Sequence, residues 1–225
     1  LRQEGKTLLD YYIHILEELG GYADINRSIM MVGAEGVLCR DRVMQSLRDR
    51  PPHKLGGYTI TRLVDYWDED SFGPFVSETD KLPRNVLQFF TDACVVIIRP
   101  SGTEPKLKFY CQLLPQEGGA PLQGRALLEE VRTKAETVAR QVYNDLLAYL
   151  DCHLSEASLL LPDIIDLERK QYFDQHMAPQ FRQALFSGNF INLNQALSWL
   201  REEGAAMVPG ADLLPALKVP FTALC

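Results

Sequence analysis

Cysteine is scarce in this chain, and its distribution excludes two common uses of the residue. The sequence of 225 residues holds five cysteines, at Cys39, Cys94, Cys111, Cys152 and Cys225. Their number is odd, they are widely scattered, and no two form a Cys-X-X-Cys pair. The spacing therefore indicates neither a disulfide framework nor a zinc site, and we expect a reducing, cytoplasmic setting.

Long apolar stretches are also missing. No apolar run is long enough to span a bilayer, which takes roughly 20 residues, and the opening residues LRQE do not resemble a signal peptide. The sequence does not open with methionine. We expect no membrane partner, and we expect the chain to be a fragment of a longer protein.

A broad basic surface is the third absence. The formal net charge is −7 and the isoelectric point is near 5.2, whereas nucleic acids and anionic membranes attract proteins with an extended positive footprint. The composition is otherwise that of a soluble globular protein, with 46% hydrophobic and 24% charged residues. We therefore expect a small ligand and no nucleic-acid partner.

Against this acidic background one segment is locally positive. Residues 99–110 read RPSGTEPKLKFY, and residues 94–114 contain a single acid, Glu104, against three bases. The run before the segment (CVVII) is β-branched, and the run LKFYC alternates apolar and polar residues, which predicts two strands joined by a turn. A polar, glycine-containing turn between strands is typical of a phosphate cradle.

The residue types in this turn suit a dianionic ligand. Arg99 offers a planar fork of donors, Gly102 permits tight backbone curvature, and the neighbouring hydroxyl groups can also donate hydrogen bonds. The candidate phosphate-binding residues are Arg99, Ser101, Gly102, Thr103, Lys106 and Lys108. Two plainer readings stay open: the turn binds nothing, and the lysines are the solvated face of an edge strand. Glu104 is expected to brace the loop and not to act as a base.

Apolar periodicity predicts an α+β fold. Helical patterns cover residues 7–19, 35–50 and 122–150, and strand patterns cover residues 57–64 and 86–91 and the two runs that flank the turn. We expect a mostly antiparallel four-stranded sheet with helices on one face. The acidic stretch DYWDED lies in the segment 65–84, which we expect to be an irregular, solvated loop rather than a metal site.

Three domains are predicted. No clear start signal precedes the helix of residues 7–19, so we interpret residues 1–21 as the terminal helix of a preceding, missing domain. Residues 22–150 form the phosphate-binding domain, and residues 151–225 form an all-α extension with helices at 163–177, 179–187 and 192–203. Three prolines in residues 205–225 favour an extended tail.

The apolar seam of this extension allows two interpretations. Its members are Ile164, Leu167, Tyr172, Phe173, Phe181, Leu185 and Phe186. They are expected to pack as a core, with contact to another domain or to a second copy of the chain as the alternative.

The segment RPSGTEPKLKFY resembles the C-terminal phosphate-binding domain of the α-D-phosphohexomutases, the phosphoglucomutase and phosphomannomutase superfamily. The stretch GAEGVLCRDRVMQSLRDRPPHKLGGYTITRLVDYWD and the stretch LPRNVLQFF are also similar to that domain. The resemblance covers roughly residues 1–150, and it implies the TBP-like fold of this family's fourth domain. By position in the motif it assigns Arg99, Ser101, Gly102 and Thr103 to the phosphate that is not transferred.

The resemblance also implies what the chain lacks. Family members carry a phosphoserine loop, an aspartate loop that binds Mg²⁺ and a sugar-recognition loop in their first three domains, and none of these motifs is present. We therefore expect no catalytic residue and no metal site in this chain, which alone should be inactive, with Mg²⁺ required only in the full-length enzyme. Its implied partners are a hexose phosphate and the missing N-terminal domains of the same enzyme.

Two functional hypotheses follow. The first is the C-terminal part of a cytoplasmic phosphohexomutase that interconverts hexose 1-phosphate and 6-phosphate through a bisphosphate, in which this domain anchors the non-transferred phosphate and closes the active site. The sequence EPKLKFY leans towards glucose or mannose phosphates. The second is a stand-alone phosphosugar-binding or sensor module without catalysis. The helical extension could also make a homo-oligomer.

Overall fold

One antiparallel sheet organises the first part of the chain. The computed structural model describes residues 5–115, 122–190 and 192–207, together with Pro215, Leu217 and Pro220. The sheet order is β1-β6-β5-β4-β3-β2, and its strands are β1 (Ala23–Met30), β2 (Lys54–Leu55), β3 (Tyr58–Asp65), β4 (Leu87–Thr91), β5 (Cys94–Pro100) and β6 (Lys106–Leu113). The α+β class is confirmed. The expectation of four strands is wrong, because β1 and the two-residue β2 complete the sheet at its two edges.

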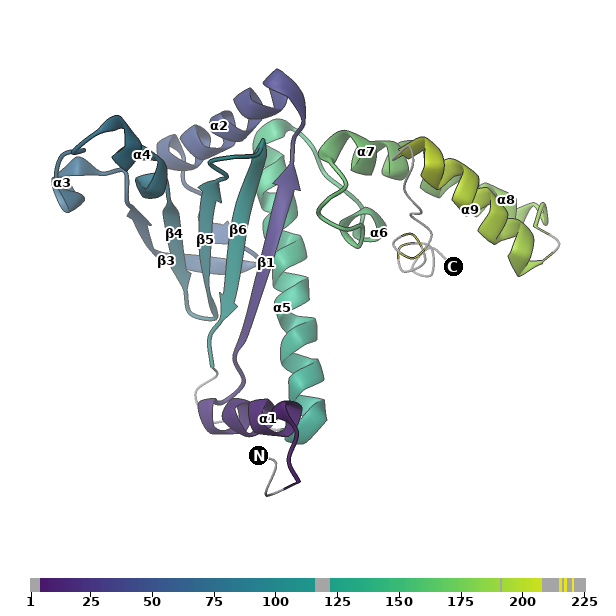
Figure 1. Cartoon of the computed structure of the whole chain (residues 1–225), viewed down its shortest axis with the longest axis horizontal. Coiled ribbons are helices and arrows are strands. Elements are labelled where there is room, and N and C mark those ends of the chain that lie inside the picture. The colour runs from purple at the N-terminus through teal and green to yellow at the C-terminus, as the bar shows by residue number, and fades with distance from the viewer. Residues whose placement is uncertain are drawn as a thin grey trace.

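Two helices cover one face of this sheet. They are α2 (Gly33–Asp49) and the long α5 (Gly124–Leu147), which is followed by a short 3₁₀ turn, η2 (Ala148–Leu150). In β6 buried and half-exposed residues alternate strictly, as a strand with one covered and one open face requires. Figure 1 shows α5 running along the strands and α2 crossing near one end of the sheet. The expectation of helices on one face is confirmed.

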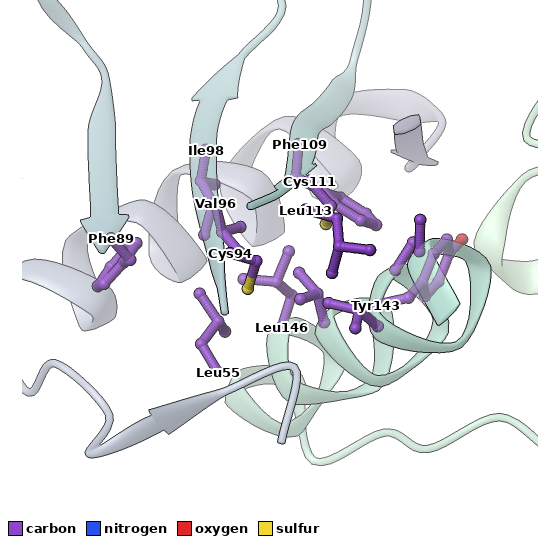
Figure 2. Packing of buried hydrophobic residues seen from close by; sticks show 14 of the residues in the cluster. Leu55, Phe89, Cys94, Val96, Ile98, Phe109, Cys111, Leu113, Tyr143 and Leu146 are labelled. Carbon is purple, nitrogen blue, oxygen red and sulfur yellow. The ribbon is translucent and has the colours of Figure 1, made fainter. Parts of the chain in front are cut away.

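The covered face forms the principal core. Val96, Ile98 and Phe109 are fully buried in the cluster that also includes Tyr143 and Leu146 of α5, and Figure 2 shows these strand side chains directed towards the helix. The ring of Phe109 meets that of Tyr143 edge to face, with centroids 6.0 Å apart, an arrangement favoured by the charge distribution of aromatic rings. Of the helices in the described part of the chain, none is long and apolar enough to cross a membrane.

The first helix, α1 (Leu8–Leu19), begins at a clear signal. Thr7 accepts a hydrogen bond from the Asp10 N–H, and the Asp10 carboxylate accepts one from the Thr7 N–H, which is a capping box with aspartate at its third position. The interpretation that no start signal precedes this helix is therefore wrong. Ile13 and Leu16 belong to the principal core, and α1 packs against α5, while Leu8 is 76% exposed.

The segment between β3 and β4 is more ordered than expected. It contains two short helices, α3 (Glu69–Phe72) and α4 (Glu78–Arg84). Arg84 donates hydrogen bonds to the carbonyl oxygens of Tyr66 and Gly73, at 3.0 and 2.9 Å. The expectation of an irregular loop is therefore wrong: the segment contains two short helices, and Arg84 ties them together.

The extension is helical and has its own small core. Its elements are α6 (Glu156–Leu159), α7 (Leu167–Tyr172), a π-helical turn η3 (Phe173–Met177), α8 (Ala178–Phe186) and α9 (Leu193–Met207). The all-α expectation is confirmed, but α9 does not stop at Gly204 as predicted; that glycine is buried and the helix continues for another three residues to Met207. The tail falls mostly outside the described residues; Pro215, Leu217 and Pro220 are helical and not extended.

The apolar seam of the extension is only partly a core. Phe173 and Phe181 are buried in the second cluster, whereas Ile164 is 80% and Phe186 89% exposed. The expectation that all seven residues pack inside is therefore wrong.

A buried charged cluster joins the extension to the sheet. Arg27 of β1 donates to the Asp163 carboxylate (Nε to Oδ1, 3.0 Å) and to the Leu159 carbonyl oxygen (3.0 Å). Lys170 is completely buried; its ammonium group donates to the Leu161 carbonyl oxygen and lies 4.8 Å from the centre of the Tyr143 ring. Burial of such charges is tolerated only where partners of this kind are present.

The pH dependence of stability tests this junction. Burial lowers the pKa of Lys170 from 10.5 to about 8. Between these values the unfolded chain holds a proton that the folded chain has released, so the contribution of Lys170 to the free energy of unfolding rises with pH. We expect the stability of the wild type, relative to Lys170→Met, to rise from pH 8 to pH 10.5 in urea denaturation. The raised pKa values of Tyr143 and Cys111 affect both proteins alike; parallel curves would contradict the assignment.

Candidate functional site

The predicted cradle is a short loop at one end of the central hairpin. Strand β5 ends at Pro100 and β6 begins at Lys106. The Ser101 N–H donates to the Lys106 carbonyl oxygen at 2.9 Å, and the Lys106 N–H donates to the Glu104 carbonyl oxygen at 2.8 Å. The loop is therefore closed by its own backbone, as the polar turn in the sequence predicts.

Helix α2 and the residues just before it hold this loop in place. The Met31 N–H donates to the Pro105 carbonyl oxygen at 2.8 Å, and the Arg40 guanidinium donates to the Ser101 carbonyl oxygen at 3.2 Å. Both residues were missed by the sequence analysis, since the contact depends on how α2 crosses the sheet. A loop anchored on both sides holds its remaining donors in fixed positions.

The register of the sheet arranges polar residues in a row on the open face. Arg99 pairs with Lys108 across β5 and β6, and Lys108 pairs with Ser28 across β6 and β1. Paired residues of neighbouring strands project to the same face, and this is the face opposite to the helices. Since β6 lies between β1 and β5, the lysines do not belong to an edge strand, although they lie on the open face of the sheet.

Arg99 has donor capacity that the protein does not use. Its Nε atom is buried and has no hydrogen-bond partner within the described part of the chain. A buried donor without a partner costs about 1–3 kcal/mol, and an oxyanion beside the guanidinium group would supply acceptors. This is the strongest indication of an anion site in the structure.

The two lysines differ in their surroundings. The ammonium group of Lys106 lies 2.6 Å from the Glu104 carboxylate, and the hydrogen bond from Lys106 lowers the pKa of Glu104. Glu104 thus stays ionised and braces the loop, as expected. Lys108 is more distant from Glu104, but its charge also contributes to the lowered pKa of that carboxylate.

Gly102 is not required by the fold. Its φ angle lies outside the left-handed region, and a Cβ atom added there would meet only Leu82 Cδ2, at 4.0 Å. The tight turn therefore does not depend on a left-handed conformation at this glycine. The absence of a side chain leaves the exposed loop backbone accessible, which is a common reason for glycine beside a ligand.

Half of the chain aligns with known proteins. The chain is 36% identical over 120 residues to a phosphoglucomutase of Staphylococcus haemolyticus and 31% identical over 116 residues to a phosphoglucomutase of Staphylococcus aureus. The resemblance to phosphoglucomutases is confirmed. Each match covers 50% of this chain and 21% of the relative, so the chain spans about a fifth of the length of these enzymes. No protein-family model matches it.

The described residues do not offer the Mg²⁺ site implied for a phosphoglucomutase. No group of three or more His, Cys, Asp or Glu side chains among them could hold a metal ion. In the acidic stretch, Asp65 accepts hydrogen bonds from Arg48 at 2.8 and 3.3 Å, and Asp68 caps α3. These carboxylates have structural partners within the fold.

The steric difference between two glycines gives a testable prediction. A Cβ atom at Gly36 would lie 2.0 Å from the Met31 carbonyl oxygen, whereas one at Gly102 would have space. We expect Gly36→Ala to lower the free energy of unfolding, measured by urea denaturation, by about 1–3 kcal/mol. Gly102→Ala should change the free energy of unfolding by less than about 0.5 kcal/mol. Equal losses in the two variants would show that Gly102 serves the fold.

Proposed function

We propose that this chain is the C-terminal part of a phosphoglucomutase or phosphomannomutase type enzyme, in which it supplies the phosphate-binding domain. The observation that carries this proposal is Arg99, whose buried Nε has no partner among the described residues. Beside it lies Gly102, where the fold has space for a side chain. The relatives named phosphoglucomutase support the proposal. The phosphate would be held by the Arg99 guanidinium group, the hydroxyl groups of Ser101 and Thr103 and the N–H groups of Gly102 and Thr103, with Lys106 and Lys108 as auxiliary charges.

The role of these residues would be positioning. The cradle offers hydrogen-bond donors and positive charge, and its one acid, Glu104, is held ionised by Lys106. Such a site can fix the phosphate of a hexose phosphate that stays in place while the reacting end of the sugar meets a nucleophile on another domain. Binding energy at the remote phosphate would then contribute to the reaction by orienting the sugar, and closure of this domain over the substrate would exclude water.

A preceding domain is the partner that this proposal requires. On α1, Leu8 is 76%, Tyr11 51% and Leu19 56% exposed, although Ile13 and Leu16 of the same helix are buried. A second apolar side of this kind suits contact with another domain of the same enzyme. The alternative of a stand-alone sugar-phosphate sensor leaves these side chains without a function.

Phosphate binding tests the cradle. Inorganic phosphate or glucose 6-phosphate at millimolar concentration is expected to shift the amide resonances of Ser101, Gly102 and Thr103 in NMR spectra of the full chain. Replacement of Arg99 by glutamine should weaken the effect by about tenfold or more, since a hydrogen bond to a charged group contributes about 1.5–3 kcal/mol.

The matched control is Arg62→Gln, which removes an arginine from β3; Arg62 lies over the ring of Phe90, at 3.9 Å from its centre. This variant should bind phosphate like the wild type. Unchanged spectra at millimolar ligand would refute the cradle.

An activity assay tests the proposal that the catalytic groups lie in other domains. The purified chain is expected to show no conversion of glucose 1-phosphate to glucose 6-phosphate in a coupled assay, because the cradle holds a phosphate but provides no nucleophile to receive one. Conversion above that of a heat-treated sample, and lost in Arg99→Gln, would contradict the proposal that the chemistry resides elsewhere.

A further inference from the structure

A second polar hollow lies beside the cradle on the open face of the sheet. It has a volume of about 250 Å³, and its walls include Asn26, Ser28, Lys106, Lys108, Tyr110 and Asp163. None of the loop residues 101–105 belongs to it. The hollow therefore shares Lys106 and Lys108 with the cradle but not its loop, and it lies on the β1 side of the row that begins with Arg99.

The residues that line this hollow include three bases, Arg27, Lys106 and Lys108, and one acid, Asp163. The hydroxyl of Ser28, the amide of Asn26 and the hydroxyl of Tyr110 are further potential donors. Lys106 contributes a second ammonium group, which Glu104 partly neutralises. Donors of this kind around a small space suit an oxyanion.

The one acid in the wall does not oppose an anion. Asp163 accepts a hydrogen bond from the Ser28 N–H at 2.6 Å and from Arg27 Nε at 3.0 and 3.2 Å. Its carboxylate is thus neutralised from behind by Arg27, whose side chain is only 13% exposed. Asp163 belongs to the extension, so the extension forms one wall of the hollow and holds the backbone of the edge strand beside it.

We propose that this hollow binds a phosphate group, in addition to the one assigned to the cradle, and that Asp163 of the extension positions its edge-strand wall. The proposal goes beyond the proposed function, because it concerns a site that the extension completes. The phosphate can be free in solution or be the second group of a ligand whose first phosphate occupies the cradle, and the two sources are separable by experiment.

The test uses amide NMR of the full chain with inorganic phosphate as the probe. We expect the resonances of Asn26, Arg27 and Ser28 to shift with a dissociation constant of their own. Lys108→Gln should weaken this response by about tenfold, while Lys54→Gln, a matched lysine on β2 at the opposite edge of the sheet, should leave it unchanged. Arg99→Gln should weaken the response of the cradle by about tenfold or more and preserve that of the hollow.

The outcomes separate the two sites. If residues 26–28 do not respond, or respond only as long as Arg99 is present, the hollow is not a site of its own, whatever the cradle does. If they respond in Arg99→Gln while residues 101–103 are silent in the wild type, the hollow stands and the cradle fails. A hexose bisphosphate that binds more tightly than either phosphate alone would identify one ligand spanning both sites, and equal affinities would identify a separate phosphate.

Asp163→Ala tests the role of the extension, with Asp163→Asn as its control, because both variants remove the negative charge and only the first also removes the acceptor of the Ser28 N–H. Removal of a carboxylate should strengthen anion binding if charge alone mattered. We expect the hollow to bind phosphate several times more weakly instead, with the cradle response intact, because the Ser28 backbone loses its support. Tighter binding at residues 26–28 would overturn the positioning role.

Discussion

The pairing of β5 with β6 is the constraint on which the rest of the structure depends. Its register sets Arg99 opposite Lys108 and Pro100 opposite Leu107, and the side chains of successive residues point to opposite faces. A slip of one residue would turn Phe109 out to solvent and Lys108 into the core. The burial of the apolar set under α2 and α5 therefore fixes which charged groups face the open side, and the closing bonds of the hairpin place the cradle at its end.

The same register makes β1 depend on the extension. Continued from β6, it places Arg27 opposite Phe109, on the face that the helices cover. A guanidinium group in that position is costly unless it is paired, and Asp163 and the Leu159 carbonyl oxygen provide the partners. Asp163 also accepts the outward-facing N–H of Ser28, which protects this edge of the sheet.

The sequence predicts those parts of the structure that depend on local patterns and misses those that depend on contacts between distant residues. The turn between β5 and β6, the four apolar strands and the two covering helices have local signatures, and the structure contains each of them. Strand β1 reads ADINRSIM. Its alternation of apolar and polar residues is interrupted by Arg27, which occupies a core-facing position. Only the contacts of Arg27 with Asp163 and Leu159, far along the chain, explain an arginine there. Arg40 and Asp163 were missed for the same reason, because each acts through tertiary packing. The extra turn of α9 past Gly204 reflects burial, which outweighs the helix-ending tendency of glycine.

The contacts of Asp163 connect the extension to the open face of the sheet through hydrogen bonds and strand pairing. Asp163 holds Ser28, Ser28 pairs with Lys108, and Lys108 pairs with Arg99. A β-sheet transmits such positions with little distortion, since each strand is bonded to the next along its length. The extension therefore cannot shift along β1 without breaking the Arg27 and Ser28 contacts, and while they hold, Ser28, Lys108 and Arg99 keep a fixed separation. A site built on one sheet face in this way can orient a phosphorylated ligand without any contribution to its chemistry.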